Sequence, residues 1–133
     1  MSDAIKHECG IALLRLKKPL EFYKEKYGTA FYGIQKMYLL MEKQHNRGQD
    51  GAGLASIKLD VNPGERYISR VRSNDTQAIQ DVFAQINERI NEELTANPEY
   101  QDNVALQKEN IPYIGELFLG HVRYGTFGKN SIE

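Results

Sequence analysis

The sequence predicts an α+β fold in which helices lie against a mostly antiparallel sheet. Several segments show the short apolar runs or the alternation of strands, whereas the segments between them place apolar residues three and four positions apart, as helices do. In chain order the main elements read strand, helix, strand, strand, helix, strand, which is typical of α+β proteins. The 133 residues are 41% hydrophobic, enough for one core and about one domain.

The first half of the chain predicts one strand and two helices. Residues 10–16 form a nearly continuous apolar run, too short for a good helix and typical of a strand that is buried on both faces. Pro19 suits the first turn of a short helix over 19–27, and Gly28 is available to end it. A longer helix is predicted over 30–44, where apolar residues recur at helical spacing: Phe31, Ile34, Met37, Tyr38 and Met41.

The second half predicts a hairpin, a long helix and a final strand. The turn signal Asn62-Pro63-Gly64 separates two strand-like segments, and Asn74 or Asp75 can cap the long amphipathic helix that follows. The predicted elements are a strand over 51–60, a strand over 66–72, a helix over 76–94, a short helix ending near Gln107 and a strand over 114–124.

Composition and charge exclude several classes of partner. The 17 lysines and arginines nearly balance 18 acidic residues, so the net charge of −1 predicts neither nucleic acid nor an anionic membrane as a partner. No apolar run approaches the ~20 residues that a membrane helix needs, so we expect a soluble protein. A single cysteine excludes an internal disulfide, and the first residues lack the features of a secretion signal, so the expected location is the cytoplasm.

The one cysteine, Cys9, stands just before the first apolar run and is a candidate nucleophile. If residues 1–8 were removed, its own α-amine could act as the base, because an α-amine titrates at roughly 7.7–8.0 and a thiol near ~8.5. The alternative is a buried structural cysteine, which is the commoner role of a lone thiol. The three histidines are scattered and show no metal-ligand spacing, so no metal site is predicted.

The glycine-rich segment over 48–53 is a second candidate feature. It lacks the lysine with serine or threonine that ends a phosphate-binding P-loop. We therefore interpret it as a tight connection from helix to strand, whose glycines let the backbone approach a substrate closely.

Three segments in register carry a resemblance to a known family. They are Glu8-Cys9-Gly10-Ile11, Asn46-Arg47-Gly48-Gln49-Asp50-Gly51 and Gly120-His121-Val122-Arg123-Tyr124-Gly125-Thr126. Together, and in this order, they resemble the class II glutamine amidotransferases. The Arg-Gly-Gln-Asp sequence is most similar to the amidophosphoribosyltransferase branch, whose members open purine synthesis.

The resemblance implies a role for five residues. Cys9 would attack the side-chain amide of glutamine and form a γ-glutamyl thioester, which water then hydrolyses. Arg123 would bind the α-carboxylate of glutamine, a task that suits the planar guanidinium fork, and Thr126 would add a hydroxyl contact. Arg47 and Gly48 would line the pocket near the nucleophile.

The resemblance also implies a fold and a domain organisation. The fold would be part of the four-layer α-β-β-α sandwich of N-terminal-nucleophile hydrolases. Residues 1–8 would be a leader that is removed, and residues 9–133 the amino-terminal part of the glutaminase domain. The oxyanion-hole pair and the phosphoribosyltransferase domain would lie beyond Glu133, so we expect weak or no activity from this chain alone and an exposed apolar sheet surface.

The cofactors and the partners follow from the same resemblance. This chain would bind glutamine but no cofactor, because magnesium, and in some relatives an iron-sulfur cluster, would belong to the part beyond Glu133. The full-length parent would be a homo-oligomer. Two alternatives remain: a glutaminase that gives ammonia to another acceptor, and a non-catalytic remnant that binds glutamine weakly or pairs with a relative through its exposed sheet.

Overall fold

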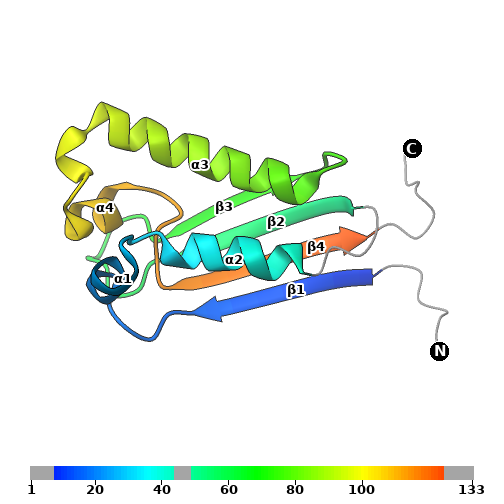
Figure 1. The fold of residues 1–133 in the computed structure, drawn as a ribbon, viewed down its shortest axis with the longest axis horizontal. Helices are drawn as coiled ribbons and strands as arrows, with labels where there is room; N and C mark the ends of the chain where they lie inside the picture. Colours follow the sequence, from blue (N-terminus) through cyan, green and yellow to red (C-terminus); the bar gives the residue numbers. More distant parts are fainter. Residues whose placement is uncertain (1–7, 44–48, 125–133) are drawn as a thin grey trace.

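The computed structural model describes residues 8–43 and 49–124. A four-stranded sheet in the order β1-β4-β2-β3, with every pairing antiparallel, carries helices on one face (Figure 1). The α+β prediction is therefore confirmed. The elements are β1 (Glu8–Arg15), α1 (Leu20–Tyr27), α2 (Tyr32–Glu42), β2 (Gln49–Ile57), β3 (Ile68–Ser73), α3 (Ala78–Ala96), the 3-10 helix η1 (Pro98–Tyr100), α4 (Val104–Asn110) and β4 (Leu117–Tyr124).

Local signals explain where several helices begin and end. Pro19 precedes α1, and Gly28 ends it with a left-handed φ of 84° while its N–H donates to the carbonyl of Lys24, as predicted. The predicted cap of α3 is wrong, because α3 starts at Ala78. The Asp75 carboxylate instead accepts a hydrogen bond from the N–H of Gln77 at 3.0 Å and closes the turn before the helix.

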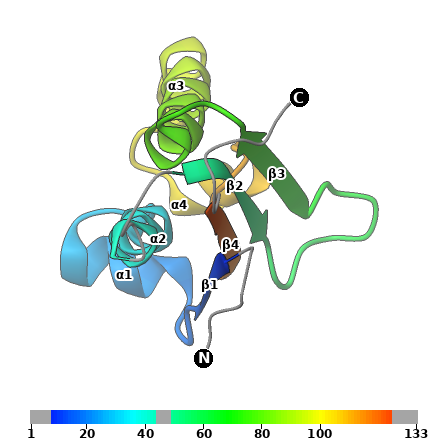
Figure 2. The ribbon, with the colours of Figure 1, turned by 90° about the vertical axis from the view of Figure 1, so that its right-hand side faces the viewer.

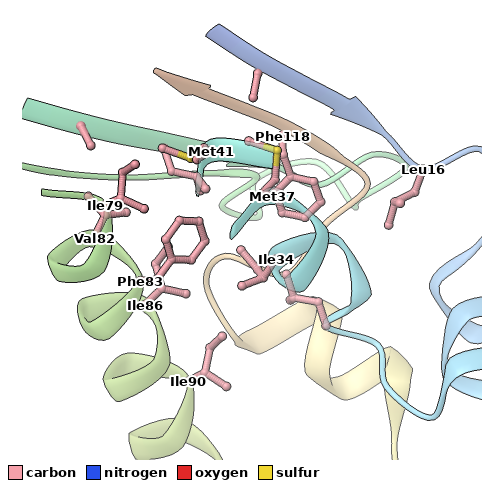
Figure 3. Packing of buried hydrophobic residues seen from close by; sticks show 14 of the residues in the cluster. Leu16, Ile34, Met37, Met41, Ile79, Val82, Phe83, Ile86, Ile90 and Phe118 are labelled. Carbon is pink, nitrogen blue, oxygen red and sulfur yellow. The ribbon is translucent and has the colours of Figure 1, made fainter. Parts of the chain in front are cut away.

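The core lies between the sheet and the helices α2 and α3 (Figure 3). Glycines let α2 approach β4 closely. A methyl group placed on Gly33 would lie 2.2 Å from Cε2 of Phe118, and one placed on Gly120 would lie 2.7 Å from Sδ of Met41. Large side chains of one element thus occupy the space that glycine leaves on the other. The fully buried side chains include Met37, Met41, Ile79, Val82, Ile86, Phe118 and Val122.

The opposite face of the sheet, here called the open face, has no helix over it (Figure 2). Ile11 and Leu13 are each 67% exposed and Leu119 is 47% exposed, although all three lie within strands. The prediction that the first strand is buried on both faces is therefore wrong. Helices cover only one side of the sheet, and the exposed apolar surface expected from the resemblance is present in the described residues.

A partly buried ion pair holds the connection between β2 and β3. Lys108 Nζ lies 2.7 Å from the Glu116 carboxylate, whose other oxygen accepts from the N–H of Leu59 at 2.9 Å. Lys108 also donates to the carbonyl of Leu59. Beside this pair, Lys58 is only 7% exposed. Burial lowers the pKa of Lys58, Lys108 adds to that effect, and Glu65 and Glu116 oppose it.

The length and polarity of the helices also show whether one of them could span a membrane. Within the described residues, no helix is both long enough and apolar enough to cross a bilayer.

The two faces of the sheet predict different costs for the same truncation. Leu54→Ala, on the covered face where Leu54 is 2% exposed, should lower the free energy of unfolding by about 2–5 kcal/mol. Leu13→Ala, on the open face, should cost under ~1 kcal/mol. Urea denaturation measures both. An equally large loss for Leu13→Ala would show that something covers the open face in solution.

Burial of Lys58 predicts a pH-dependent cost. Because its pKa is lower in the folded chain than the ordinary 10.5, the unfolded chain binds more protons between the two values, and stability attributable to Lys58 rises with pH in that window. Lys58→Met should therefore be more stable than the parent at neutral pH, and the gap should narrow as pH approaches 10.5. Denaturation of both proteins across this range measures the gap, and a constant gap would contradict the assignment.

Candidate functional site

The strand register brings the sequence-predicted nucleophile and carboxylate-binding residue together. Cys9 in β1 is the direct cross-strand partner of Arg123 in β4, and on the other side of β4 Arg123 pairs with Gly51 in β2. Direct partners in antiparallel strands have Cα atoms about 4.5–5.5 Å apart. One segment from each of the three motifs therefore meets in a single row at one end of the sheet.

Three of the predicted site residues lie outside the part of the chain that the structure describes. Arg47, Gly48 and Thr126 lie outside residues 8–43 and 49–124, so their predicted roles stay predictions. Of the described pair, Arg123 is exposed. The backbone of Cys9 is placed within β1 by its pairing with Arg123.

The glycines of β2 leave space that side chains of β4 occupy. A methyl group placed on Gly53 would lie 2.5 Å from Nε2 of His121, so the imidazole occupies the space that a side chain would take. A methyl group on Gly51 would lie 3.8 Å from Nη2 of Arg123 and 3.3 Å from Oδ1 of Asn74. These two glycines lie inside a strand and not in a helix-to-strand connection. Side chains of this protein lie close to both glycines, the His121 ring at Gly53 and the Asn74 amide at Gly51.

Arg72 lies next to these residues on β3, the strand on the other side of β2. It is exposed and pairs with Gly53, which in turn pairs with His121. We call Arg72, Asn74, His121 and Arg123, together with Gly51 and Gly53 beneath them, the glycine-floored cluster. It lies on the open face at the end of the sheet that holds the row of Cys9.

Arginines gather on the open face, and two of them belong to the glycine-floored cluster. By the strand register, Arg15, Arg70, Arg72 and Arg123 belong to this face. Within the described part of the chain, none of these arginines forms an ion pair. Such an end of the sheet favours negatively charged groups.

Arg123 was predicted as a site residue from the sequence, whereas Arg72 and Asn74 were not. The alternation of Arg70 and Arg72 with Ser69, Val71 and Ser73 indicates that both arginines share one face of a strand. Nothing in the sequence places that face beside His121, because the two strands are separated by β2. His121 had no visible partner in the sequence, and its neighbour proved to be Gly53.

A separate cleft lies at the far end of the sheet. It has a volume of about 480 Å³ between the start of α1, the β2–β3 loop and α4. Charges of both signs line it, including Lys17, Lys18 and Glu109, with the Lys108–Glu116 pair at its wall. The same pair bonds both the N–H and the carbonyl of Leu59, so its two charged groups already have partners within the protein. In residues 8–43 and 49–124, no three His, Cys, Asp or Glu side chains group as metal ligands.

Comparisons with protein-family models, with curated proteins and with solved structures found no match to this chain.

The contact between Gly53 and His121 predicts a local response to one methyl group. Gly53→Ala should displace the imidazole, because a Cβ at 2.5 Å from Nε2 cannot be accommodated without movement. The cost in stability should stay below ~1 kcal/mol, since the exposed ring can rotate away. The NMR resonances of the His121 ring report the displacement.

Ala55→Gly is the matched control, because Ala55 lies on the same face of β2 one row further along and pairs with Leu119. It should leave the His121 ring resonances unchanged. Unchanged resonances in Gly53→Ala would contradict the packing described above.

Proposed function

We propose that this chain carries the nucleophile-bearing part of a class II glutamine amidotransferase, which releases ammonia from glutamine. The observation that carries the proposal is the register in which Cys9, Arg123 and Gly51 share one row. Segments that resemble the family in sequence are far apart in the chain, and the sheet pairs them directly. If the resemblance were due to chance, there would be no reason for these three segments to lie side by side in the sheet.

The reaction needs a thiolate, a base and a grip on the substrate. With residues 1–8 removed, the α-amine of Cys9 takes the thiol proton, and the sulfur attacks the amide carbon of glutamine. The proton passes to the leaving nitrogen as the C–N bond breaks, so ammonia departs and a γ-glutamyl thioester remains. Water then attacks the thioester, which releases glutamate and restores the thiol.

Arg123 is well placed to hold the substrate's α-carboxylate. Its Nη2 lies over Gly51, on the side of β4 away from β1. A carboxylate held there leaves the rest of the glutamine free to extend across β4 toward Cys9. In this proposal Thr126 adds a hydroxyl contact, and Arg47 and Gly48 line the pocket near the sulfur.

The open face supports the fold that this function implies. In an α-β-β-α sandwich of the N-terminal-nucleophile type, a second sheet covers the face opposite the helices, and here that face exposes Ile11, Leu13 and Leu119. Within the family we favour the amidophosphoribosyltransferase branch, in which ammonia passes to phosphoribosyl pyrophosphate, because of the sequence Arg47-Gly48-Gln49-Asp50. Another acceptor is the alternative. We place the reaction in the cytoplasm and expect the parent to be a homo-oligomer.

A non-catalytic pairing module is the second candidate function, and the same open face favours it. Exposed apolar strands are surfaces through which a chain can pair with another protein. In that case Cys9 would be an ordinary thiol.

The proposed function predicts a processed and reactive Cys9. The intact mass of the purified chain should begin at Cys9, and an electrophilic glutamine analogue should label that residue. Removing the Arg123 guanidinium with Arg123→Ala should raise the concentration needed for half-maximal labelling roughly tenfold or more, because a charge-assisted bond is worth about 1.5–3 kcal/mol. Mass spectrometry measures all three results.

Arg15→Ala is the matched control, because Arg15 lies on the same strand as Cys9 but at its opposite end, paired with Leu117. It should label like the parent. A chain that begins at Cys9 and yet resists labelling would overturn the proposal, and a chain that retains Glu8 and resists labelling would favour the pairing module.

A further inference from the structure

We propose that the glycine-floored cluster is a binding site for an oxyanion, a carboxylate or a phosphate, held by Arg72, His121 and Asn74 beside Arg123. The cluster shares Arg123 and Gly51 with the carboxylate site of the proposed function. The inference goes beyond that function in giving a part to Arg72, Asn74 and His121, which have no role in the glutaminase reaction. It also does not depend on removal of residues 1–8.

The cluster offers hydrogen-bond donors suited to an anion. The guanidinium groups of Arg72 and Arg123 are always protonated and present planar forks that match a carboxylate or a phosphate. The imidazole of His121 and the side-chain amide of Asn74 add N–H donors. Among the described residues, no carboxylate forms an ion pair with either arginine.

The glycines explain why the donors can converge here. β3 and β4 flank β2, and neighbouring strands lie about 4.7–4.9 Å apart. The side chains of His121 and Arg123 already lean over Gly53 and Gly51, toward the strand of Arg72. Because neither glycine has a side chain, nothing from β2 separates the donors of its two neighbours.

The next row along the sheet shows the contrast. Arg70 is exposed on the same face of the same strand, but it pairs with Ala55, and Ala55 pairs with Leu119. An arginine there faces a methyl group and a leucine, with no second cation across β2. Arg70 is therefore a matched control for Arg72, because both are exposed arginines of the same strand.

The test is a titration of the full chain with sodium phosphate and, separately, with L-glutamate at constant ionic strength, followed by NMR of the His121 ring. We expect saturable shifts with at least one of the two anions. Arg72→Ala should weaken that binding at least tenfold, whereas Arg70→Ala should change it less than twofold. Gly53→Ala should also weaken it, because the ring is displaced.

The outcomes separate the source of the anion from the existence of the site. Tighter binding of phosphate identifies a phosphorylated ligand, and tighter binding of glutamate identifies a carboxylate ligand. Shifts that never saturate with either anion, or equal weakening by Arg70→Ala and Arg72→Ala, would overturn the proposal. Failure of Cys9 labelling leaves this result untouched, so the two proposals can fail separately.

Discussion

The pairing of β4 with strands on both of its sides is the constraint on which the rest of the structure depends. β1 and β2 never touch each other in the sheet, and each is held by β4 along its length. The registers of these two pairings place Cys9, Arg123 and Gly51 in one row. A shift of one residue in the register of either pairing would move the side chains of a whole strand to the other face of the sheet. The candidate site is thus a property of two ladders of backbone hydrogen bonds.

Glycines set the geometry on both faces of the sheet. On the covered face, Gly33 admits the ring of Phe118, which is fully buried and has no room to move. On the open face, Gly53 admits the ring of His121, which is exposed. The same absence of a side chain therefore produces tight packing in the core in one place and an exposed hydrogen-bonding group in the other.

Much of the fold could be predicted from the sequence, because periodicity reports which residues share a face. The helical spacing of Ile79, Val82, Phe83 and Ile86 correctly indicated one buried stripe on α3. The burial of β1 on both faces was wrongly predicted, since an apolar run shows what a strand can bury and not what lies over it. The end of β2 was predicted three residues late, at 60 instead of Ile57. The chain turns there, and Asp60 has a positive φ of 56° that the sequence pattern did not indicate.

The site was only partly predictable for a different reason. Short motifs identified Cys9 and Arg123, whose pairing the register then supplied. Arg72 and His121 come from strands that are not neighbours in the sheet, and no local pattern encodes that both pair with Gly53. Relations of this kind depend on strand order, which periodicity does not report.

The position of β4 has a consequence for how the molecule folds. Among the described strands, β1 comes first in the chain and pairs only with β4, which comes last. β1 therefore cannot form these hydrogen bonds until almost all of the described chain is available. Non-local closure of this sort slows folding, because the entropy of a long loop is lost before its contacts form. Until then, the apolar segment that contains Ile11 and Leu13 stays an unpaired strand. Unpaired apolar strands of this kind are prone to aggregate, and chaperones protect such surfaces.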